Sequence, residues 1–234
     1  MTQIEAAFEA IREGKFILLY DFDSRERETD FAICADALTS THIRTMRKDG
    51  GGLICTAIHP IAAKRLHLPF AYELLRESGV VEQIGEVPYD PKNRSSFSLW
   101  VNHRSTFTGI TDRDRAATIN AIADQVRQSL NGGGANFAAQ FRTPGHVAIL
   151  RAADRLLDQR HGQTELSVAL ALGAGVVPAM VICEMLDDET GLAMNRDDAM
   201  AYAERHGLVF VDGEMVMKWW DTARDELLHL IGDR

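Results

Sequence analysis

Apolar residues follow two different periods along the chain, and these periods predict alternating helices and strands. The apolar positions between Ile4 and Ile11 share one face of a helix predicted over Thr2 to Arg12, and Gly14 is suited to end it. The unbroken apolar run KFILLY at 15–20 then predicts a buried strand. Further strands are predicted at 31–37, 53–58, 97–103, 147–153, 177–186 and 208–212.

Capping residues and helical periodicity predict helices between these strands. Thr111 and Asp114 have the spacing of a capping box ahead of the helical pattern at 114–130. Asn195 can cap a helix at 196–206, which Gly207 ends. Other helices are predicted from about position 40 and at 60–68, 69–78, 164–175 and 214–231, whereas 81–96 is expected to be loop.

This alternation indicates an α+β protein with a three-layer α/β/α arrangement around a mixed sheet. The glycine-rich break at 131–136 is too short to mark a domain boundary, so a single domain over residues 1–234 is expected. No apolar run approaches the roughly 20 residues that span a bilayer. The first residues lack the blocks of a signal peptide. We therefore expect a cytoplasmic protein that does not contact membranes.

Charge and cysteine usage exclude several classes of function. The net charge is −9 and no stripe of Lys and Arg is present, which disfavours nucleic acid as a partner. The three cysteines are odd in number and far apart, as reduced thiols of a cytosolic protein are. A phosphate ligand would need local arginines and backbone amides to hold it against the acidic field.

The segment DFDSRERETD at 21–30 places five acidic and two basic residues directly after the first predicted strand. A solvated charged turn would show the same composition. The other interpretation is a hard-cation site, because clustered carboxylate oxygens suit Mg²⁺ or Mn²⁺ and leave room for a substrate oxygen.

The order of several motifs decides between these interpretations. YDFDSRERETD resembles the acidic loop of 3,4-dihydroxy-2-butanone 4-phosphate synthase, a riboflavin-pathway enzyme, and more closely its stand-alone archaeal form without a cyclohydrolase domain. Similar segments follow over nearly the whole chain, in the order IRTMRKDGGGLICTAIHP, SSFSLWVNHRSTFTGITDRDRAATI, FRTPGHVAILRAA, RHGQTELSVALA and VICEMLDDETGLAMNR.

The resemblance implies a Mg²⁺- or Mn²⁺-dependent lyase with two ions per site, which converts ribulose 5-phosphate into 3,4-dihydroxy-2-butanone 4-phosphate and formate. It also implies a homodimer with active sites near the subunit interface. A related fold occurs in threonylcarbamoyl-AMP synthases, which bind ATP and RNA. The acidic loop and the lack of a basic surface pattern count against that alternative.

The same resemblance assigns roles within the acidic loop. Glu26 resembles the metal-bridging carboxylate, and Arg25 lies beside it against the substrate. Asp30 resembles the residue that binds substrate hydroxyls. The acidic pocket is completed by Asp21, Asp23 and Glu28. Arg27 and Thr29 stand where many members have Asn and Gly, which changes the loop's shape more than its chemistry.

Other motifs supply candidate acid/base and substrate residues. His146 and Glu184 resemble the family's two acid/base positions. Both residue types suit that role, because an imidazole titrates near neutrality and burial raises the pKa of a carboxylate. A loop histidine and a structural ion pair are the alternatives for these two residues. Cys55 is either a buried thiol or part of the pocket wall, and Thr108 is either a substrate-side or a packing residue.

RHGQTE at 160–165 departs from the family pattern R-x-G-H-T-E. Arg160, Gly162 and Thr164 match its phosphate-holding residues, but Gln163 occupies the position of the metal-binding histidine, and His161 lies two residues before it. Gln163 could offer its amide oxygen to the ion. His161 could instead supply the missing imidazole if 161–163 are extended, or the protein is a catalytically impaired sugar-phosphate-binding paralogue or variant.

Overall fold

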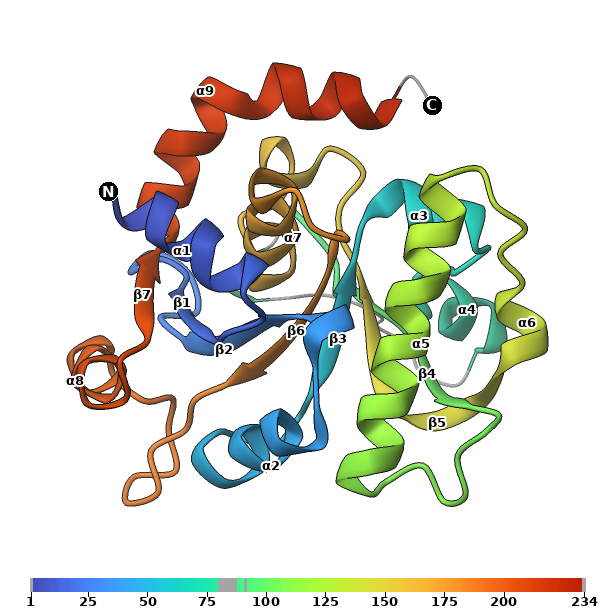
Figure 1. Ribbon diagram of the computed structural model, residues 1–234, viewed down its shortest axis with the longest axis horizontal. Helices are drawn as coiled ribbons and strands as arrows, with labels where there is room; N and C mark the ends of the chain where they lie inside the picture. Colours follow the sequence, from blue (N-terminus) through green and yellow to red (C-terminus); the bar gives the residue numbers. More distant parts are fainter. Residues whose placement is uncertain (1, 80–87, 91, 233–234) are drawn as a thin grey trace.

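A mixed β-sheet forms the centre of the computed structural model, which describes residues 2–79, 88–90 and 92–232, the last four of them by their backbone alone. Among these residues, seven strands pair in the order β4-β5-β3-β6-β2-β1-β7 (Figure 1). β3 is parallel to β5 and β1 to β7, and the other neighbours are antiparallel. The strands are β1 (Ile17–Tyr20), β2 (Thr29–Cys34), β3 (Cys55–Ile58), β4 (Phe97–His103), β5 (Phe141–Arg151), β6 (Ala179–Glu184) and β7 (Val209–Asp212).

Helices cover both faces of the sheet, so the predicted three-layer arrangement is confirmed. The α-helices are α1 (Gln3–Arg12), α2 (Ser40–Asp49), α3 (Pro60–Arg65), α4 (Ala71–Ser78), α5 (Asp112–Leu130), α6 (Phe137–Gln140), α7 (Gln163–Ala174), α8 (Arg196–His206) and α9 (Gly213–Gly232). Two short 3₁₀ turns, η1 (Ala35–Ala37) and η2 (Leu156–Asp158), complete the regular structure.

Alternating residues of each central strand supply two separate hydrophobic cores. In β2, Phe31 and Ile33 belong to the first core, while Ala32 and Cys34 belong to the second. α2, α5 and α8 pack on the first core, and α1, α7 and α9 pack on the second. Because both faces are buried, these strands are continuous apolar runs and carry no alternating polar pattern.

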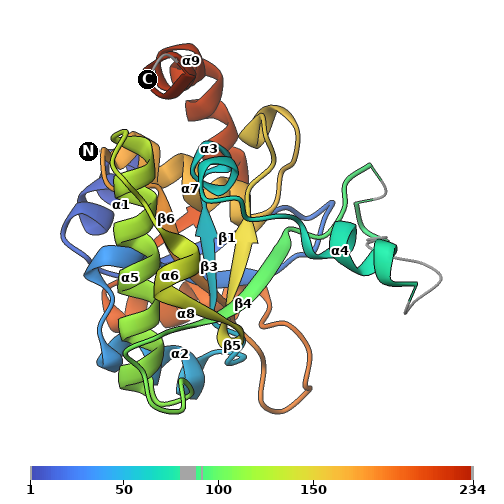
Figure 2. The same ribbon diagram turned by 90° about the vertical axis from the view of Figure 1, so that its right-hand side faces the viewer.

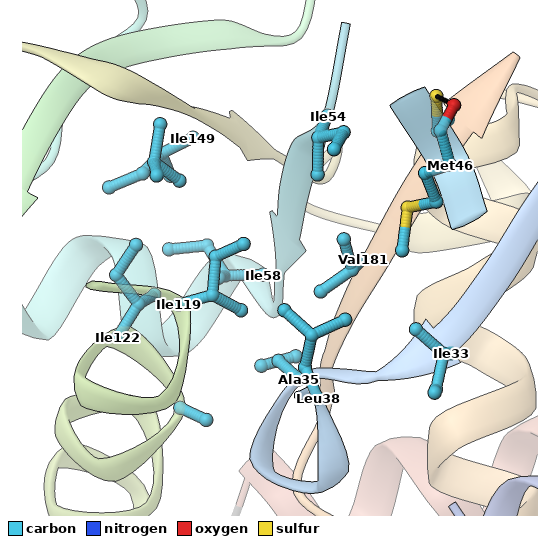
Figure 3. Packing of buried hydrophobic residues seen from close by; sticks show 14 of the residues in the cluster. Ile33, Ala35, Leu38, Met46, Ile54, Ile58, Ile119, Ile122, Ile149 and Val181 are labelled. Atoms are coloured by element: carbon cyan, nitrogen blue, oxygen red, sulfur yellow. Dashed lines mark hydrogen bonds between the residues drawn. The ribbon is translucent and has the colours of Figure 1, made fainter. Parts of the chain in front are cut away.

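Figure 3 shows how the first core joins helices to strands. Ile119 and Ile122 of α5 lie over Ile58 of β3, and Met46 of α2 lies near Val181 of β6. All five of these side chains are fully buried. Burial of one such side chain contributes about 1.5–3 kcal/mol, so this layer holds α2 and α5 against the sheet.

The predicted helix boundaries were accurate where a capping residue was present. Asn195 accepts a hydrogen bond from the Asp198 N–H at 3.0 Å and begins α8, which Gly207 ends in the left-handed conformation. Thr111 accepts from the Asp114 N–H at 3.1 Å, but Asp114 does not complete the box. Its carboxylate instead accepts from the Gly109 N–H at 2.9 Å and so shapes the turn before α5.

The clearest differences from the sequence prediction are in β2, β5 and α6. The predicted strand at 31–37 ends at Cys34 of β2, and 35–37 forms the 3₁₀ turn η1. β5 begins at Phe141, six residues earlier than predicted, because 141–146 still pairs with β4 across an irregular register. The Asn102 side chain bridges the irregularity by accepting a hydrogen bond from the His146 N–H at 2.8 Å. α6 was not predicted, since it is a single turn and only the capping residue Asn136 indicates it in the sequence.

α4 stands away from the body of the molecule in Figure 2, and none of its residues is buried. Half of the predicted loop at 81–96 that follows it, namely 81–87 and 91, lies outside the described residues. Within the part of the chain that is described, no helix has the length and apolar character needed to cross a membrane.

His59 links the stability of this fold to pH. It is 2% exposed, its Nδ1 accepts from the Ile61 N–H at 3.2 Å, and its Nε2 has no hydrogen-bond partner among the described residues. Burial lowers its pKa from 6.5 to about 4. The unfolded chain therefore binds this proton near pH 6.5 and the folded chain only near pH 4, so stability is lost as pH falls through that window.

We expect His59→Asn, which replaces the capping Nδ1 acceptor by an amide oxygen and cannot titrate, to flatten the pH dependence of unfolding. Between pH 6.5 and 4 the parent should lose up to about 3 kcal/mol more than the variant, at 1.36 kcal/mol per unit of pKa shift. Urea unfolding across this range measures the difference. Parallel curves for the two proteins would show that His59 contributes nothing to acid sensitivity.

Candidate active site

A cavity of about 240 Å³ at the ends of β2 and β6 collects most of the predicted site residues. The β1–β2 loop, the first turn of α7 and the sheet itself form its walls. Its lining includes the predicted residues Glu26, Glu28, Asp30, Cys55, Arg160, Gln163, Thr164 and Glu184.

Asp21 organises the acidic loop from beneath and does not itself line this cavity. It is fully buried, and its two carboxylate oxygens accept from the Glu28 N–H at 3.1 Å and the Glu26 N–H at 3.0 Å. Arg25 adds an ion pair to Asp21 at 3.3 Å and one to Glu26 at 2.6 Å. The loop is thereby folded so that Glu26 and Glu28 line the cavity.

The two residues of this loop that depart from the family pattern, Arg27 and Thr29, do not line the cavity among its described residues. Arg27 adopts a left-handed conformation with φ of 59°, which Asn tolerates more readily, and its Nε donates to the Asp23 carbonyl at 2.7 Å. Asp23 is exposed and accepts from the Tyr20 hydroxyl at 2.7 Å. Arg27 and Asp23 do not line the cavity among its described residues.

The pairing of β2 with β6 places Asp30 directly opposite Glu184. Burial, followed by the charge of Glu184, raises the pKa of Asp30 well above its usual value. Burial also raises the pKa of Glu184, and burial with Glu26 and Glu184 raises that of Glu28 to about 7. Glu28 can therefore hold a proton near neutral pH, as an acid/base group must, and the pKa values of Asp30 and Glu184 are shifted in the same direction.

Gln163 begins α7 and lines the acidic cavity. Its Nε2 donates to the carbonyl oxygens of Leu19 at 2.9 Å and Glu28 at 3.1 Å. Two carbonyl acceptors fix which end of the amide is the nitrogen. Its Oε1 is buried and has no hydrogen-bond partner within the described part of the chain.

A buried ion pair holds Arg160 at the same end of α7. Its Nη1 donates to Glu165 at 2.6 Å, and the other carboxylate oxygen of Glu165 accepts from the Ala153 N–H at 2.9 Å. A Cβ on Gly162 would lie 2.1 Å from this Nη1, so only glycine leaves room for the guanidinium. The Arg160 Nε is buried without a hydrogen bond to any described residue, and the nearest carboxylate oxygen, on Asp90, is 3.9 Å away.

Cys55 forms part of the apolar wall together with Leu150 and Ile182. Burial, followed by the charges of Glu184 and Asp30, raises the pKa of its thiol well above the usual value. The thiol therefore stays protonated and cannot act as a thiolate nucleophile.

Besides Asp21, Asp23, Arg25 and Gly162, three further predicted residues do not line this cavity in the described structure. The exposed ring of His161 lies 5.9 Å from the ring of Phe22, so the structure does not support His161 as the replacement ligand. Thr108 is exposed near Asp114, with 3.5 Å between the hydroxyl and the carboxylate. His146 is exposed on β5 beside Asn102.

The sheet register shows how far His146 lies from the acidic residues. Cys55 is opposite both Ile182 and Ala148, so position 53 falls between Glu184 and His146. Two strand spacings of about 4.8 Å each therefore separate their backbones by roughly 10 Å. His146 lies along the same edge of the sheet but too far from Glu184 for direct contact.

Sequence reasoning missed Tyr89, Ser95 and Ser96, which also line the cavity. The Tyr89 ring lies 5.1 Å from the Arg25 guanidinium, and burial, followed by Glu26, raises the pKa of its phenol. The available signal was an aromatic residue beside Pro88 in an otherwise polar loop. An aromatic residue in such a loop more often packs against other side chains than projects freely into solvent.

The cavity suits a hard cation that keeps part of its hydration shell. In the described chain, no three His, Cys, Asp or Glu side chains converge as a closed metal shell. Mg²⁺ needs no such shell, because it is usually bound by one or two carboxylates with waters and substrate oxygens. Two buried oxygens here lack hydrogen-bond partners among described residues, Gln163 Oε1 and Asp30 Oδ1. Such orphaned acceptors in an acidic cavity fit a cation.

Comparison with known proteins agrees with this geometry. The family model of 3,4-dihydroxy-2-butanone 4-phosphate synthase matches residues 5–219. The enzyme of that name from Methanosarcina mazei is 54% identical over 92% of this chain and 90% of its own length. The one from Archaeoglobus fulgidus is 51% identical over 96% of this chain and 97% of its own.

Solved structures show the same fold. A 3,4-dihydroxy-2-butanone 4-phosphate synthase in complex with two magnesium ions superimposes with a TM-score of 0.78 and 29% identity, covering 95% of this chain and 98% of that one. The Candida albicans enzyme gives a TM-score of 0.74 at 29% identity, over 94% and 97%. The chain therefore belongs to the 3,4-dihydroxy-2-butanone 4-phosphate synthase family of enzymes.

Proposed function

We propose that this protein is a Mg²⁺-dependent lyase that converts ribulose 5-phosphate into 3,4-dihydroxy-2-butanone 4-phosphate and formate for riboflavin biosynthesis, within a single catalytic domain. The main support is the unpartnered Gln163 Oε1, which is held by two backbone contacts in the carboxylate-lined cavity. An amide oxygen in this position favours an active enzyme over an impaired sugar-phosphate-binding relative.

One relative was solved in complex with two magnesium ions, and we propose two ions per site here. Glu26 and the Gln163 Oε1 are the residues that would hold the cation, with Mn²⁺ as a second suitable ion. When bound, it would withdraw electron density from the substrate carbonyl and acidify the adjacent C–H bonds. The Glu28 N–H donates to Asp21, and the Arg25 guanidinium pairs with both Asp21 and Glu26. These contacts keep the loop carboxylates in place.

The other cavity residues are suited to bind and reprotonate the sugar phosphate. Arg160, with a free Nε–H among the described contacts, and Thr164 at the first turn of α7 would hold the phosphate, since a helix N-terminus favours anions. Asp30 would bind substrate hydroxyls. Glu184, whose pKa is raised by burial, would take up and return protons during the reaction.

We further infer a homodimer in which His146 and Thr108 act at the cavity of the partner subunit. Both are exposed and do not line the cavity of their own chain. Apolar side chains are exposed near them, with Phe107 at 92% and Ile110 at 51% exposure. An apolar surface around polar site residues is typical of an interface.

Glu26→Ala should lower formate release from ribulose 5-phosphate by at least about 100-fold at saturating Mg²⁺, since even changes around a metal ligand cost roughly 10–100-fold. Asp23→Ala is the matched control, because Asp23 is an exposed carboxylate of the same loop that points to Tyr20. Near-full turnover by Glu26→Ala would remove Glu26 from the metal site.

Gln163→Leu should raise the Mg²⁺ concentration for half-maximal formate release about tenfold or more, because it removes the amide oxygen while keeping similar bulk. Gln163→His should keep the enzyme active. Titration of Mg²⁺ against formate release measures both effects. If the unmodified chain releases no formate and only Gln163→His does, the impaired-variant interpretation is correct and the proposed activity is wrong for this sequence.

Mixing inactive subunits tests the composite site. In a dimer of one Glu26→Ala and one His146→Ala subunit, one site receives both defects and the other receives neither. A statistical mixture should therefore recover about one quarter of parental formate release, since half of its dimers are mixed and half of their sites are intact. Recovery near zero, with mixed dimers verified by mass, would show that His146 serves the cavity of its own chain.

A further inference from the structure

The C-terminal helix contacts the turn that precedes Arg160. α9 follows β7 and passes beside α7 (Figure 1). On it, Trp220 is fully buried, and its indole Nε1–H donates to Asp158 at 2.9 Å. Arg224, one turn further along α9, donates to the same carboxylate oxygen at 3.3 Å. Asp158 therefore receives two hydrogen bonds from one helix.

The turn held by these contacts determines the backbone position of Arg160. Asp158 ends η2, and the Arg160 N–H donates to the carbonyl of Leu156, the first residue of η2, at 3.0 Å. Leu156 has a φ of 47°, a left-handed conformation that is unfavourable for a leucine. Such a conformation persists only when its surroundings enforce it.

Packing and polar contacts act together on this turn. Leu156 and Leu157 are fully buried in the second core, which also contains Trp220. The packing alone would be kept by any aromatic residue at 220. The hydrogen bond is specific to tryptophan, because the buried indole N–H requires an acceptor and Asp158 is the one it has.

We propose that Trp220 and Asp158 are positioning residues for the phosphate subsite, acting through the turn 156–160 on Arg160. The inference rests on the proposed role of Arg160 in binding the substrate phosphate. Trp220 lies just beyond the 5–219 segment that the family model matches, so nothing in that match assigns it a role. Neither residue lines the described cavity, so both act at a distance from the substrate.

Trp220→Phe keeps an aromatic ring in the core and removes only the N–H donor. We expect it to raise the KM for ribulose 5-phosphate about fivefold, as expected for the loss of one hydrogen bond, while kcat stays within about twofold. The calorimetric Kd for inorganic phosphate should rise by a similar factor. Trp219→Phe is the matched control, because Trp219, also on α9, packs against Phe8 of α1 and makes no contact with Asp158 among the described interactions.

Asp158→Asn and Asp158→Ala separate positioning from general stability. The asparagine keeps an oxygen acceptor for the indole and should restore near-parental KM, whereas alanine should reproduce the Trp220→Phe defect. Equal KM and equal phosphate Kd in Trp220→Phe, Asp158→Ala and the parent would overturn the proposal. A parent that binds phosphate but releases no formate would instead refute the proposed function, and the phosphate Kd values would still test the positioning role.

Discussion

Two carboxylic acids lie opposite each other on the paired strands β2 and β6, and the rest of the site is arranged around the repulsion between them. Asp30 and Glu184 are register partners, so their side chains leave the same face of the sheet at neighbouring positions. Like charges placed directly opposite destabilise a sheet, and burial increases the cost. The two groups must therefore keep a proton or receive a positive charge, which is the condition that an acid/base pair near a cation requires.

The positive charges of the protein only partly balance the carboxylates around the cavity. Of the carboxylates Asp21, Glu26, Glu28, Asp30 and Glu184, Arg25 pairs with Asp21 and Glu26. The second arginine, Arg160, is already neutralised by the fully buried Glu165. Asp30 and Glu28 form no ion pair among the described residues, and burial, followed by neighbouring carboxylates, raises their pKa values. A divalent cation would meet this excess of negative charge, and the neutral Gln163 amide can contribute an oxygen without adding to it.

The sequence was sufficient for the parts of the structure that depend on local chemistry. Apolar runs located the central strands, Asn195 and Gly207 bounded α8, and the order of motifs identified Glu26, Glu28, Asp30 and Glu184 as one cavity. Features that depend on tertiary contacts could not be read from the chain. The extension of β5 relies on Asn102 replacing regular pairing, and Asp21 binds backbone amides of its own loop instead of lining the cavity. Tyr89 reaches the site only because its loop folds over Arg25.

The register is the physical basis for the proposed site that two subunits share. Glu184, position 53 and His146 follow one another across adjacent strands, so a rigid sheet sets their spacing and side-chain rotation cannot remove the roughly 10 Å between the two ends. The residue between them, Leu53, is 49% exposed although it is apolar. A second copy that covers Leu53 would exclude water from the mouth of the acidic cavity. Exclusion of water strengthens the electrostatic interactions within a site, so the surface that favours association is also the one whose burial would favour the chemistry.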